Sequence, residues 1–343
     1  MPRTECLTRA SASLLFFAVL AALLAALAAC APKSTGLGPM IAPPALESDA
    51  LVTADGLKLP LKRWLPEGEE PKAVIVALHG MNDYSNAFAM PGPWWAEHGI
   101  ATYAYDQRGF GRAPDRGIWP GTEALVSDLD AMVALVDGRY PKLPVYLVGE
   151  SMGGAVVMAA LARPDHPKIA GAVLAAPAVW GRAAMGLPTR VALFLGVHSL
   201  PWYQLTGEGL HIVPSDNIEM LKALARDPLV IKETRIDTVW GLVNLMDQAL
   251  ASSQKLDDVP LLILYGEHDE VIPKEPTRDM IEALPPDPQE RRRIAIYPKG
   301  YHMLLRDLEA KTVWGDMLAW IEDPARALPS GADRTGLGFL AKE

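Results

Sequence analysis

Cysteine is scarce in this 343-residue chain: Cys6 and Cys30 are the only two, so a disulfide framework is excluded. Long runs of lysine and arginine are also absent, the longest being Arg291-Arg292-Arg293, and 32 basic against 41 acidic side chains give a formal net charge of −9. Nucleic-acid binding rests on basic patches that neutralise phosphate, so no nucleic-acid partner is expected.

The sequence contains no G-x-x-x-x-G-K-[ST] or H-E-x-x-H motif and no Cys/His cluster with metal-ligand spacing. Neither a metal nor a cofactor is therefore expected.

The balance of apolar and charged residues indicates a folded protein. Half of the residues are hydrophobic and 21% are charged, so the chain can bury a large core and is not disordered as a whole. At roughly 150 residues per domain, the length corresponds to about two domains, or to one α/β domain with an insertion.

The N-terminus has the pattern of an export signal. Arg3 and Arg9 precede an uncharged apolar stretch, residues 14–29, which is shorter than the about 20 residues of a membrane-spanning helix. The last residues of this stretch and the cysteine that follows, Leu-Ala-Ala-Cys30, resemble the lipobox of bacterial lipoproteins. The resemblance implies a cleaved signal peptide, residues 1–29, and acylation of Cys30. An ordinary signal peptide that happens to end before a cysteine is the alternative.

The next segment is consistent with a lipid anchor. Residues 30–49 are rich in Pro, Gly and Ser and predict a flexible tether between the modified Cys30 and a soluble domain. The residue after the cysteine is Ala31 rather than an aspartate, which resembles lipoproteins sent to the outer membrane. We therefore expect an exported bacterial lipoprotein that is attached to the membrane through Cys30, on the periplasmic side of the outer membrane.

From about residue 50 the sequence alternates between strand and helix patterns. Residues 50–65 alternate in part around Asp55-Gly56, which predicts a β-hairpin. Short continuous apolar runs predict strands that are buried on both faces of a parallel sheet. These runs are 73–78, 101–105, 145–148, 169–176, 261–265 and 294–297. Apolar residues at helical spacing predict helices over 122–137, 152–162, 274–284 and 307–321. The alternation predicts an α/β fold with a mostly parallel sheet flanked by helices, over residues 50–323.

One long segment interrupts this alternation. Residues 178–257 contain several helical stretches and no convincing strand, and they are too long for an ordinary loop. They predict an inserted helical cap, in which Trp180, Trp202 and Trp240 are candidates for contact with a substrate. More than half of the apolar cap residues are expected simply to pack on the main domain. The last residues, 324–343, lack periodicity and predict a flexible tail.

The strongest chemical signal is Gly149-Glu150-Ser151-Met152-Gly153, which lies between a predicted strand and a predicted helix. In a G-x-S-x-G nucleophile elbow, a serine occupies a strained strand-to-helix turn at the carboxyl edge of the sheet. Its hydroxyl is a weak nucleophile that needs a general base, itself oriented by a carboxylate. Ser151 is therefore the predicted nucleophile, and the alternative is a serine that only caps a helix.

The expected chain order in this kind of fold is Ser, then Asp or Glu, then His. Asp269 and His302 each follow a predicted strand, so they reach the same sheet edge as Ser151. Glu267 is held as a reserve acid, whereas His268 is interpreted as a loop histidine because it adjoins Asp269.

An oxyanion hole would complete the site. One donor should be the backbone N–H of Met152, which follows the nucleophile, and the other should come from the loop His79-Gly80-Met81-Asn82. We expect that second N–H at Met81, with His79 supporting the turn.

Taken together, these motifs resemble the monoacylglycerol lipase and lysophospholipase branch of the α/β hydrolases. The residues that carry the resemblance are HGMN at 79–82, DQRGFG at 106–111, GESMGG at 149–154, RDPL at 226–229, GEHD at 266–269 and GYH at 300–302. Ser151, Asp269 and His302 match the triad of that family, and Met81 and Met152 match its oxyanion donors. The loop HGMNDYS departs from HGxxEHS, and Arg112-Ala113 stand where a serine is common, so we expect the entrance to the site to be shaped differently from that of the family.

The resemblance implies hydrolysis of a carboxylic ester through an acyl-enzyme on Ser151. An apolar cap favours single-chain lipid esters as substrates, such as monoacylglycerols or lysophospholipids. A short-chain carboxylesterase or thioesterase is one alternative, and a peptidase lacks support because no amine-binding carboxylate cluster is evident. A lipid-anchored binding protein without catalysis is an alternative of another class.

Overall fold

The computed structural model describes residues 31–338 except 210, 258, 335 and 337. The predicted signal peptide and Cys30 therefore lie outside the described residues. Within the part of the chain that is described, no helix has the length and apolar character needed to cross a membrane.

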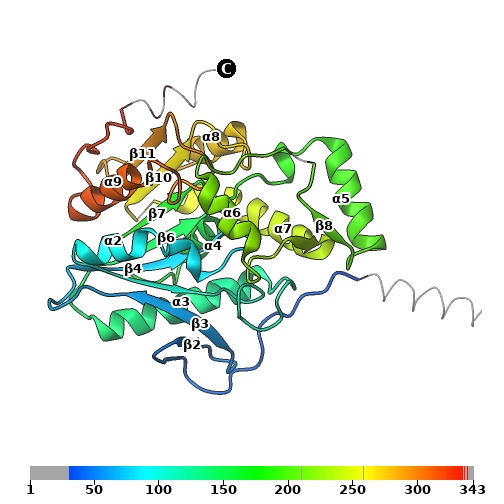
Figure 1. The fold of residues 1–343 in the computed structure, drawn as a ribbon, viewed down its shortest axis with the longest axis horizontal. Helices are drawn as coiled ribbons and strands as arrows, with labels where there is room; N and C mark the ends of the chain where they lie inside the picture. The colour runs from blue at the N-terminus through cyan, green and yellow to red at the C-terminus, as the bar shows by residue number, and fades with distance from the viewer. Residues whose placement is uncertain (1–30, 210, 258, 335, 337, 339–343) are drawn as a thin grey trace, which may run out of the picture.

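A nine-stranded sheet forms the centre of the molecule (Figure 1), in the order β1-β2-β3-β5-β4-β6-β7-β10-β11. The strands are β1 (Ala45–Leu46), β2 (Ala50–Val52), β3 (Lys58–Trp64), β4 (Ala73–Leu78), β5 (Ile100–Tyr105), β6 (Val145–Glu150), β7 (Gly171–Ala175), β10 (Leu261–Gly266) and β11 (Arg292–Tyr297). From β5 to β11 the neighbours run parallel, whereas β1, β2 and β3 form an antiparallel edge. The prediction of a mostly parallel α/β sheet is confirmed, and the predicted hairpin is β2–β3.

Helices cover both faces of the sheet. In chain order they are α2 (Pro91–Glu97), α3 (Thr122–Arg139), α4 (Met152–Leu161), α5 (Leu187–Ser199), α6 (Ile218–Arg226), α7 (Ile236–Ser252), α8 (Lys274–Glu282) and α9 (Ala310–Glu322). Short 3-10 helices occur at Ser85–Phe88, Arg182–Ala184 and Ser253–Lys255. The tryptophans of α2 and α9 pack in one apolar core, while apolar residues of α3, α4, α7 and α8 share the other.

The strand order changes direction beside β4. The chain passes from β4 to β5 on one side and then to β6 on the other, so the carboxyl ends of β4 and β6 are neighbours. Leu78 at the end of β4 pairs with Gly149 in β6. Open α/β sheets bind ligands at such a switch point. The sheet therefore brings the loop that begins at His79 next to the turn that contains Ser151.

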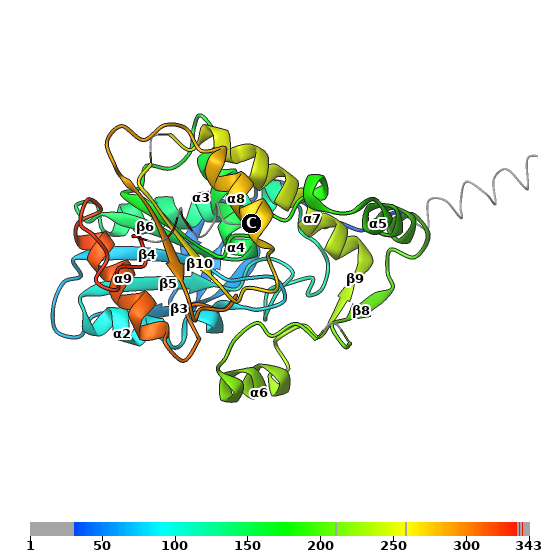
Figure 2. The same cartoon turned by 90° about the horizontal axis from the view of Figure 1, so that it is seen from above.

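The segment between β7 and β10 contains the predicted cap, with one difference. Besides α5 and α6, it holds β8 (Gln204–Thr206) and β9 (Glu233–Arg235), which pair antiparallel where no strand is expected from the sequence. These strands are short, and β8 is exposed throughout, so they lack the apolar run by which a buried strand is predicted. Figure 2 shows α5 and this ribbon projecting from the body of the molecule. In contrast, α7 packs against α4 as part of the core.

The segment after Cys30 lies against the domain, which differs from the free tether expected. We call residues 31–44 the N-terminal strap. The backbone N–H of Lys33 donates to Asp237 Oδ2 (3.1 Å), and that of Thr35 donates to the carbonyl of Trp119 (3.1 Å). Further along, the N–H of Gly38 donates to Asp55 Oδ2 (2.9 Å). Backbone hydrogen bonds of this kind cannot be read from Pro, Gly and Ser content alone.

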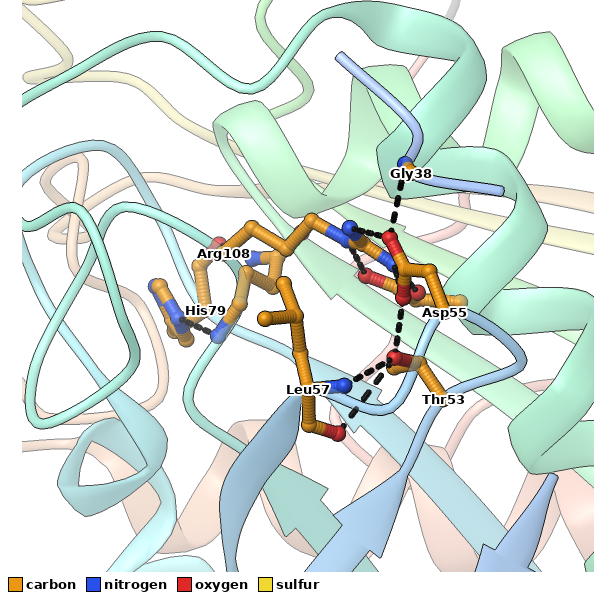
Figure 3. A network of polar contacts seen from close by, with 8 residues as sticks. Gly38, Thr53, Asp55, Leu57, His79 and Arg108 are labelled. Carbon is orange, nitrogen blue, oxygen red and sulfur yellow. Dashed lines mark hydrogen bonds and ion pairs between the residues drawn. The ribbon is translucent and has the colours of Figure 1, made fainter. Parts of the chain in front are cut away.

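A buried guanidinium joins the strap to the core (Figure 3). Arg108 donates to both oxygens of Asp55, at 2.6 and 2.9 Å, and to both oxygens of Asp128, at 2.6 and 2.7 Å. Arg108 holds the pKa of Asp55 far below its usual range, whereas burial raises the pKa of Asp128 to about 6. Arg108, in the DQRGFG motif, thus connects the β2–β3 turn with α3. The same turn accepts the hydrogen bond from Gly38 of the strap.

The described part of the tail also packs on the domain. Leu328 and Ala332 are buried, and the N–H of Ile296 in β11 donates to the carbonyl of Ala332 (3.0 Å). Ser330 donates to Asp316 in α9. Residues 324–334 therefore differ from the flexible tail expected over 324–343, because single buried side chains and backbone bonds hold them without any regular helix or strand.

Candidate active site

Ser151 occupies a strained turn between β6 and α4. Its φ of 52° and ψ of −114° lie outside the regions that most side chains adopt. The turn leaves no space around it: a Cβ on Gly153 would lie 2.2 Å from the carbonyl oxygen of Leu78, and one on Gly149 would lie 2.5 Å from Gly153. These are the features expected of a nucleophile elbow. Backbone strain of this kind persists only where the surroundings hold it.

His302 and Asp269 meet at the same edge of the sheet. Asp269 follows β10, His302 follows β11, and Nδ1 of His302 lies 2.9 Å from Asp269 Oδ2. The other oxygen of Asp269 accepts from the backbone N–H groups of Val271 and Ile272, at 2.8 and 2.9 Å. The carboxylate side chain is fully buried. This is the geometry of a general base with its orienting acid.

The alternative acid and histidine near the end of β10 lie at the surface. Glu267 and His268 are both exposed, and the ring of His268 packs on Tyr301 with a centroid separation of 5.2 Å. Asp269 makes the contact with His302, so the structure favours Asp269 over the reserve acid Glu267 as the orienting carboxylate.

The loop after β4 is supported by His79, as the sequence analysis expects. The buried Nε2 accepts from the backbone N–H of Gln107 (3.0 Å), so Nδ1 is the protonated nitrogen that donates to the carbonyl of Gly80 (2.8 Å). The Gln107 side chain donates to the His79 carbonyl (2.8 Å). Burial lowers the pKa of His79, which keeps the ring neutral in this role.

This supported loop reaches Ser151 directly. A Cβ on Gly80 would lie 3.3 Å from the Cβ of Ser151, so only a glycine allows this approach without displacement. Met81 follows in the same loop, and Met152 is the first residue of α4. Their backbone N–H groups therefore belong to the two segments that flank the serine, and their role as oxyanion donors stays a prediction.

A buried cluster that the sequence analysis missed connects three loops of the candidate site. Arg306 donates from Nη1 to Asp83 Oδ2 (2.7 Å) and from Nη2 to Glu150 Oε2 (3.0 Å). Asp83 belongs to the loop after β4, Glu150 precedes Ser151, and Arg306 follows His302. All three side chains are buried. Asp83 and Glu150 lie in recognisable motifs, but nothing in the sequence identifies Arg306 as their partner.

The charges of this cluster act on the histidine. Burial opposes protonation of His302, but the charge and hydrogen bond of Asp269 and the charge of Glu150 outweigh it and raise the pKa of His302. The positive charge of Arg306 counts in the opposite direction. A raised pKa makes the imidazole a stronger base for removing a proton from a hydroxyl.

The cap is hydrogen-bonded to the loops of the candidate site. Tyr84 donates to Asp227 Oδ2 (2.7 Å), and the Asn82 amide donates to Thr234 Oγ1 (2.7 Å). On the other side, the N–H of Met303 donates to the carbonyl of Pro214 (2.9 Å). Tyr84 stands where the HGxxEHS pattern has a histidine. Its hydrogen bond to Asp227, in the RDPL stretch, joins the loop after β4 to the cap.

The three tryptophans proposed as substrate contacts occupy different environments. Trp180 is partly buried against the core, and Trp202 is exposed beyond α5. Trp240 in α7 lies under the guanidinium of Arg182, 4.1 Å from the ring centroid, and against Phe194 of α5. The role of these tryptophans in binding substrate stays a prediction. Across the described residues, no group of three or more His, Cys, Asp or Glu side chains could hold a metal ion.

Comparison with known proteins finds lipases of similar sequence and fold. A monoacylglycerol lipase of Mycolicibacterium smegmatis is 26% identical over 282 residues, which cover 78% of this chain and 93% of that protein. A monoglyceride lipase of Rattus norvegicus is 28% identical over 81% of this chain and 93% of its own length. The structure of a soluble variant of monoglyceride lipase from Saccharomyces cerevisiae matches 86% of this chain and 99% of that chain, with a TM-score of 0.69 at 19% identity.

The sequence profile of the Hydrolase_4 family, described as serine aminopeptidase, S33, matches residues 69–309. That range includes β4 to β11, the cap and each of the candidate catalytic residues. Because the match extends over more than half of the chain and the fold is that of an α/β hydrolase, the chain belongs to this family.

Proposed function

We propose that the protein is a serine hydrolase that cleaves carboxylic esters of single-chain lipids, such as monoacylglycerols or lysophospholipids, through an acyl-enzyme on Ser151. The observation that carries the proposal is the hydrogen bond between His302 and the buried Asp269, at the same sheet edge as a serine held in a strained elbow. Serine hydrolases need this combination of nucleophile, base and orienting acid.

The chemistry follows from the residue positions. His302 Nε2 accepts the proton of the Ser151 hydroxyl as its oxygen attacks the ester carbonyl, and Asp269 stabilises the imidazolium that forms. The N–H groups of Met81 and Met152 donate to the oxyanion. His302 then returns the proton to the leaving alcohol. Water, deprotonated by His302, releases the fatty acid and restores the serine.

Two observations support a lipid rather than a small ester. Three relatives of similar sequence are named as monoacylglycerol or monoglyceride lipases. A cap is also hydrogen-bonded to the loops around Ser151, through Tyr84 and Asn82. Such a cap can cover an acyl chain while the ester carbonyl reaches the serine, and ligand sites are mostly apolar with a few fixed polar groups.

A fluorophosphonate probe should label the chain at Ser151, and Ser151→Ala should remove the label. Hydrolysis of p-nitrophenyl esters should increase with acyl length up to the medium chains if the cap binds a lipid. A preference for acetate would instead indicate a short-chain carboxylesterase or thioesterase. Labelling of the alanine variant, or no labelling of the unsubstituted chain, would contradict the proposal and favour a binding protein without catalysis. Aminoacyl p-nitroanilides in the same assay test the peptidase activity that the family description names.

We also propose that the protein is exported and anchored in the membrane through a lipid on Cys30, on the periplasmic side of the outer membrane. The basis is the sequence pattern of residues 1–30, which lie outside the described structure. Intact-mass spectrometry of the membrane fraction should show a chain that begins at an acylated Cys30, and Cys30→Ser should leave the protein uncleaved and unacylated. An unmodified Cys30 in mature protein would refute the anchor.

A further inference from the structure

A short segment of the cap runs along the two loops that carry the proposed acid and base. Residues 213–217 lie between β8 and α6, and we call them the cap connector. The N–H of Val213 donates to Glu270 Oε2 (2.8 Å), and the carbonyl of Pro214 accepts from the N–H of Met303 (2.9 Å). Glu270 and Met303 directly follow the proposed orienting acid and general base. The connector therefore contacts both halves of the acid–base pair through their next neighbours in the chain.

The turn that carries His302 is closed by Asp307. Asp307 Oδ2 accepts from the N–H of Tyr301 (2.8 Å), the residue before His302, and its own N–H donates to the carbonyl of Met303 (3.1 Å). The side chain of Asp307 is buried, and burial raises its pKa to about 6. At a higher pH the side chain is a carboxylate, and both of its oxygens accept hydrogen bonds.

The second oxygen of Asp307 binds the cap connector. Oδ1 accepts from the hydroxyl of Ser215 (2.6 Å), and Ser215 Oγ accepts from the N–H of Asn217 (3.2 Å). Ser215 is 0% exposed, and the Asn217 amide donates to the carbonyl of Arg306 (2.9 Å). A hydrogen bond from a hydroxyl to a carboxylate is stronger than one between neutral groups. One buried carboxylate therefore holds the backbone before His302 on one side and the cap on the other.

We propose that Asp307 is a positioning residue for His302, and that Ser215 makes the position of this base depend on the place of the cap. Asp307 acts through the backbone of Tyr301, and the hydroxyl of Ser215 passes a displacement of the connector to the turn. A catalytic group that is displaced by about 1 Å can lose about 10²-fold in rate. The proposal rests on the proposed role of His302 in ester hydrolysis, and it adds a route from the cap to the base.

Two substitutions separate the cap from this turn. Ser215→Ala removes the donor to Oδ1 and leaves the bond to Tyr301. In Asp307→Asn the N–H of Tyr301 still requires an oxygen, so the asparagine NH₂ group must face Ser215 in place of an acceptor. Ser253→Ala is the matched control, because Ser253 is also a serine with 0% exposure, and its hydroxyl donates to the carbonyl of Leu250 in α7 (2.8 Å).

The kinetic test uses p-nitrophenyl butyrate at a pH well above the pKa of Asp307. In S215A and in D307N, kcat should fall about ten-fold while KM stays within about two-fold, and S253A should keep the kcat of the unsubstituted chain. The rate of fluorophosphonate labelling should fall in parallel, because it needs the same base. The double variant S215A/D307N should be no slower than D307N, since both substitutions remove one link. A merely structural role would lower the unfolding temperature of S215A and S253A alike, without this separation of kcat from KM.

Proton NMR adds a measurement that does not depend on catalysis. The proton between His302 Nδ1 and Asp269 should give a resonance far downfield, and D269N identifies this resonance by removing it. The resonance should move in S215A and stay in place in S253A.

Equal values of kcat and an equal resonance in S215A and S253A would overturn the proposal. Losses that multiply in S215A/D307N would also overturn it, because Ser215 would then act without Asp307. If the unsubstituted chain hydrolyses no ester and takes no fluorophosphonate label, the proposed function fails, and the resonance alone decides whether the cap positions His302.

Discussion

Replacing Asp269 by asparagine is expected to lower kcat/KM for ester hydrolysis by about 10⁴-fold with little change in stability. The side chain keeps its size, and its position is set by two different sets of partners. Oδ1 accepts from the N–H groups of Val271 and Ile272, and Oδ2 faces Nδ1 of His302.

The hydrogen-bond pattern explains why this substitution should lower kcat/KM so much. The two backbone N–H groups require an oxygen, so the asparagine NH₂ group must face His302. A donor in that place favours the tautomer in which Nδ1 is unprotonated and Nε2 carries the proton. Nε2 then cannot accept the proton of Ser151. The loss should therefore appear in kcat for acylation, measured by the rate of fluorophosphonate labelling as well as by steady-state hydrolysis.

Glu267→Gln is the matched control, since Glu267 lies two residues earlier and is also an acid near the end of β10. Its side chain is exposed, and the same kinetic constants should remain within about two-fold of the unsubstituted chain. If E267Q instead loses the activity and D269N retains it, the orienting acid has been assigned to the wrong residue. Near-UV circular dichroism of both variants verifies that the tertiary structure is unchanged.

The positions of the candidate catalytic residues in the fold were predictable because they depend on short stretches of sequence. A run such as Ala73–Leu78 is buried in full, so its length and apolar content already predict a central strand. Once the parallel strands are recognised, Ser151, Asp269 and His302 each follow one of them and must emerge at a single edge. The chain order then matches the requirement of the fold.

The features that escaped prediction depend on contacts between distant segments. Strands β8 and β9 are only three residues long and have no apolar run. The strap donates hydrogen bonds from its backbone N–H groups, which every residue except proline possesses. The amino-acid composition of the strap therefore does not indicate which residues it binds. Arg306 is separated from Asp83 by 223 residues, and pairing across that distance is decided by the fold.

Replacing Arg306 by methionine is expected to reduce the free energy of unfolding by about 3–5 kcal/mol at neutral pH. Methionine fills much of the same volume, but the buried carboxylates of Asp83 and Glu150 lose the guanidinium that both contact. An unpaired charge in a buried site is costly. Urea unfolding of R306M against the unsubstituted chain measures the loss, and D83N/E150Q/R306M should recover much of it because no unpaired charge remains.

The pH dependence separates this electrostatic role from simple packing. Burial already raises the pKa of Glu150 in the folded state, and loss of the Arg306 charge, which lowers this pKa, should raise it further. The folded state of R306M then binds a proton more readily than the unfolded chain, so its deficit in stability should shrink as the pH falls through the raised pKa of Glu150. The kinetics should show opposite shifts, because Glu150 raises the pKa of His302 and Arg306 lowers it. The acid limb of kcat/KM should move to higher pH in R306M and to lower pH in E150Q, since His302 must be neutral to accept the proton of Ser151. Limbs that coincide in both variants and in the unsubstituted chain would show that the cluster holds the loops together without tuning the base.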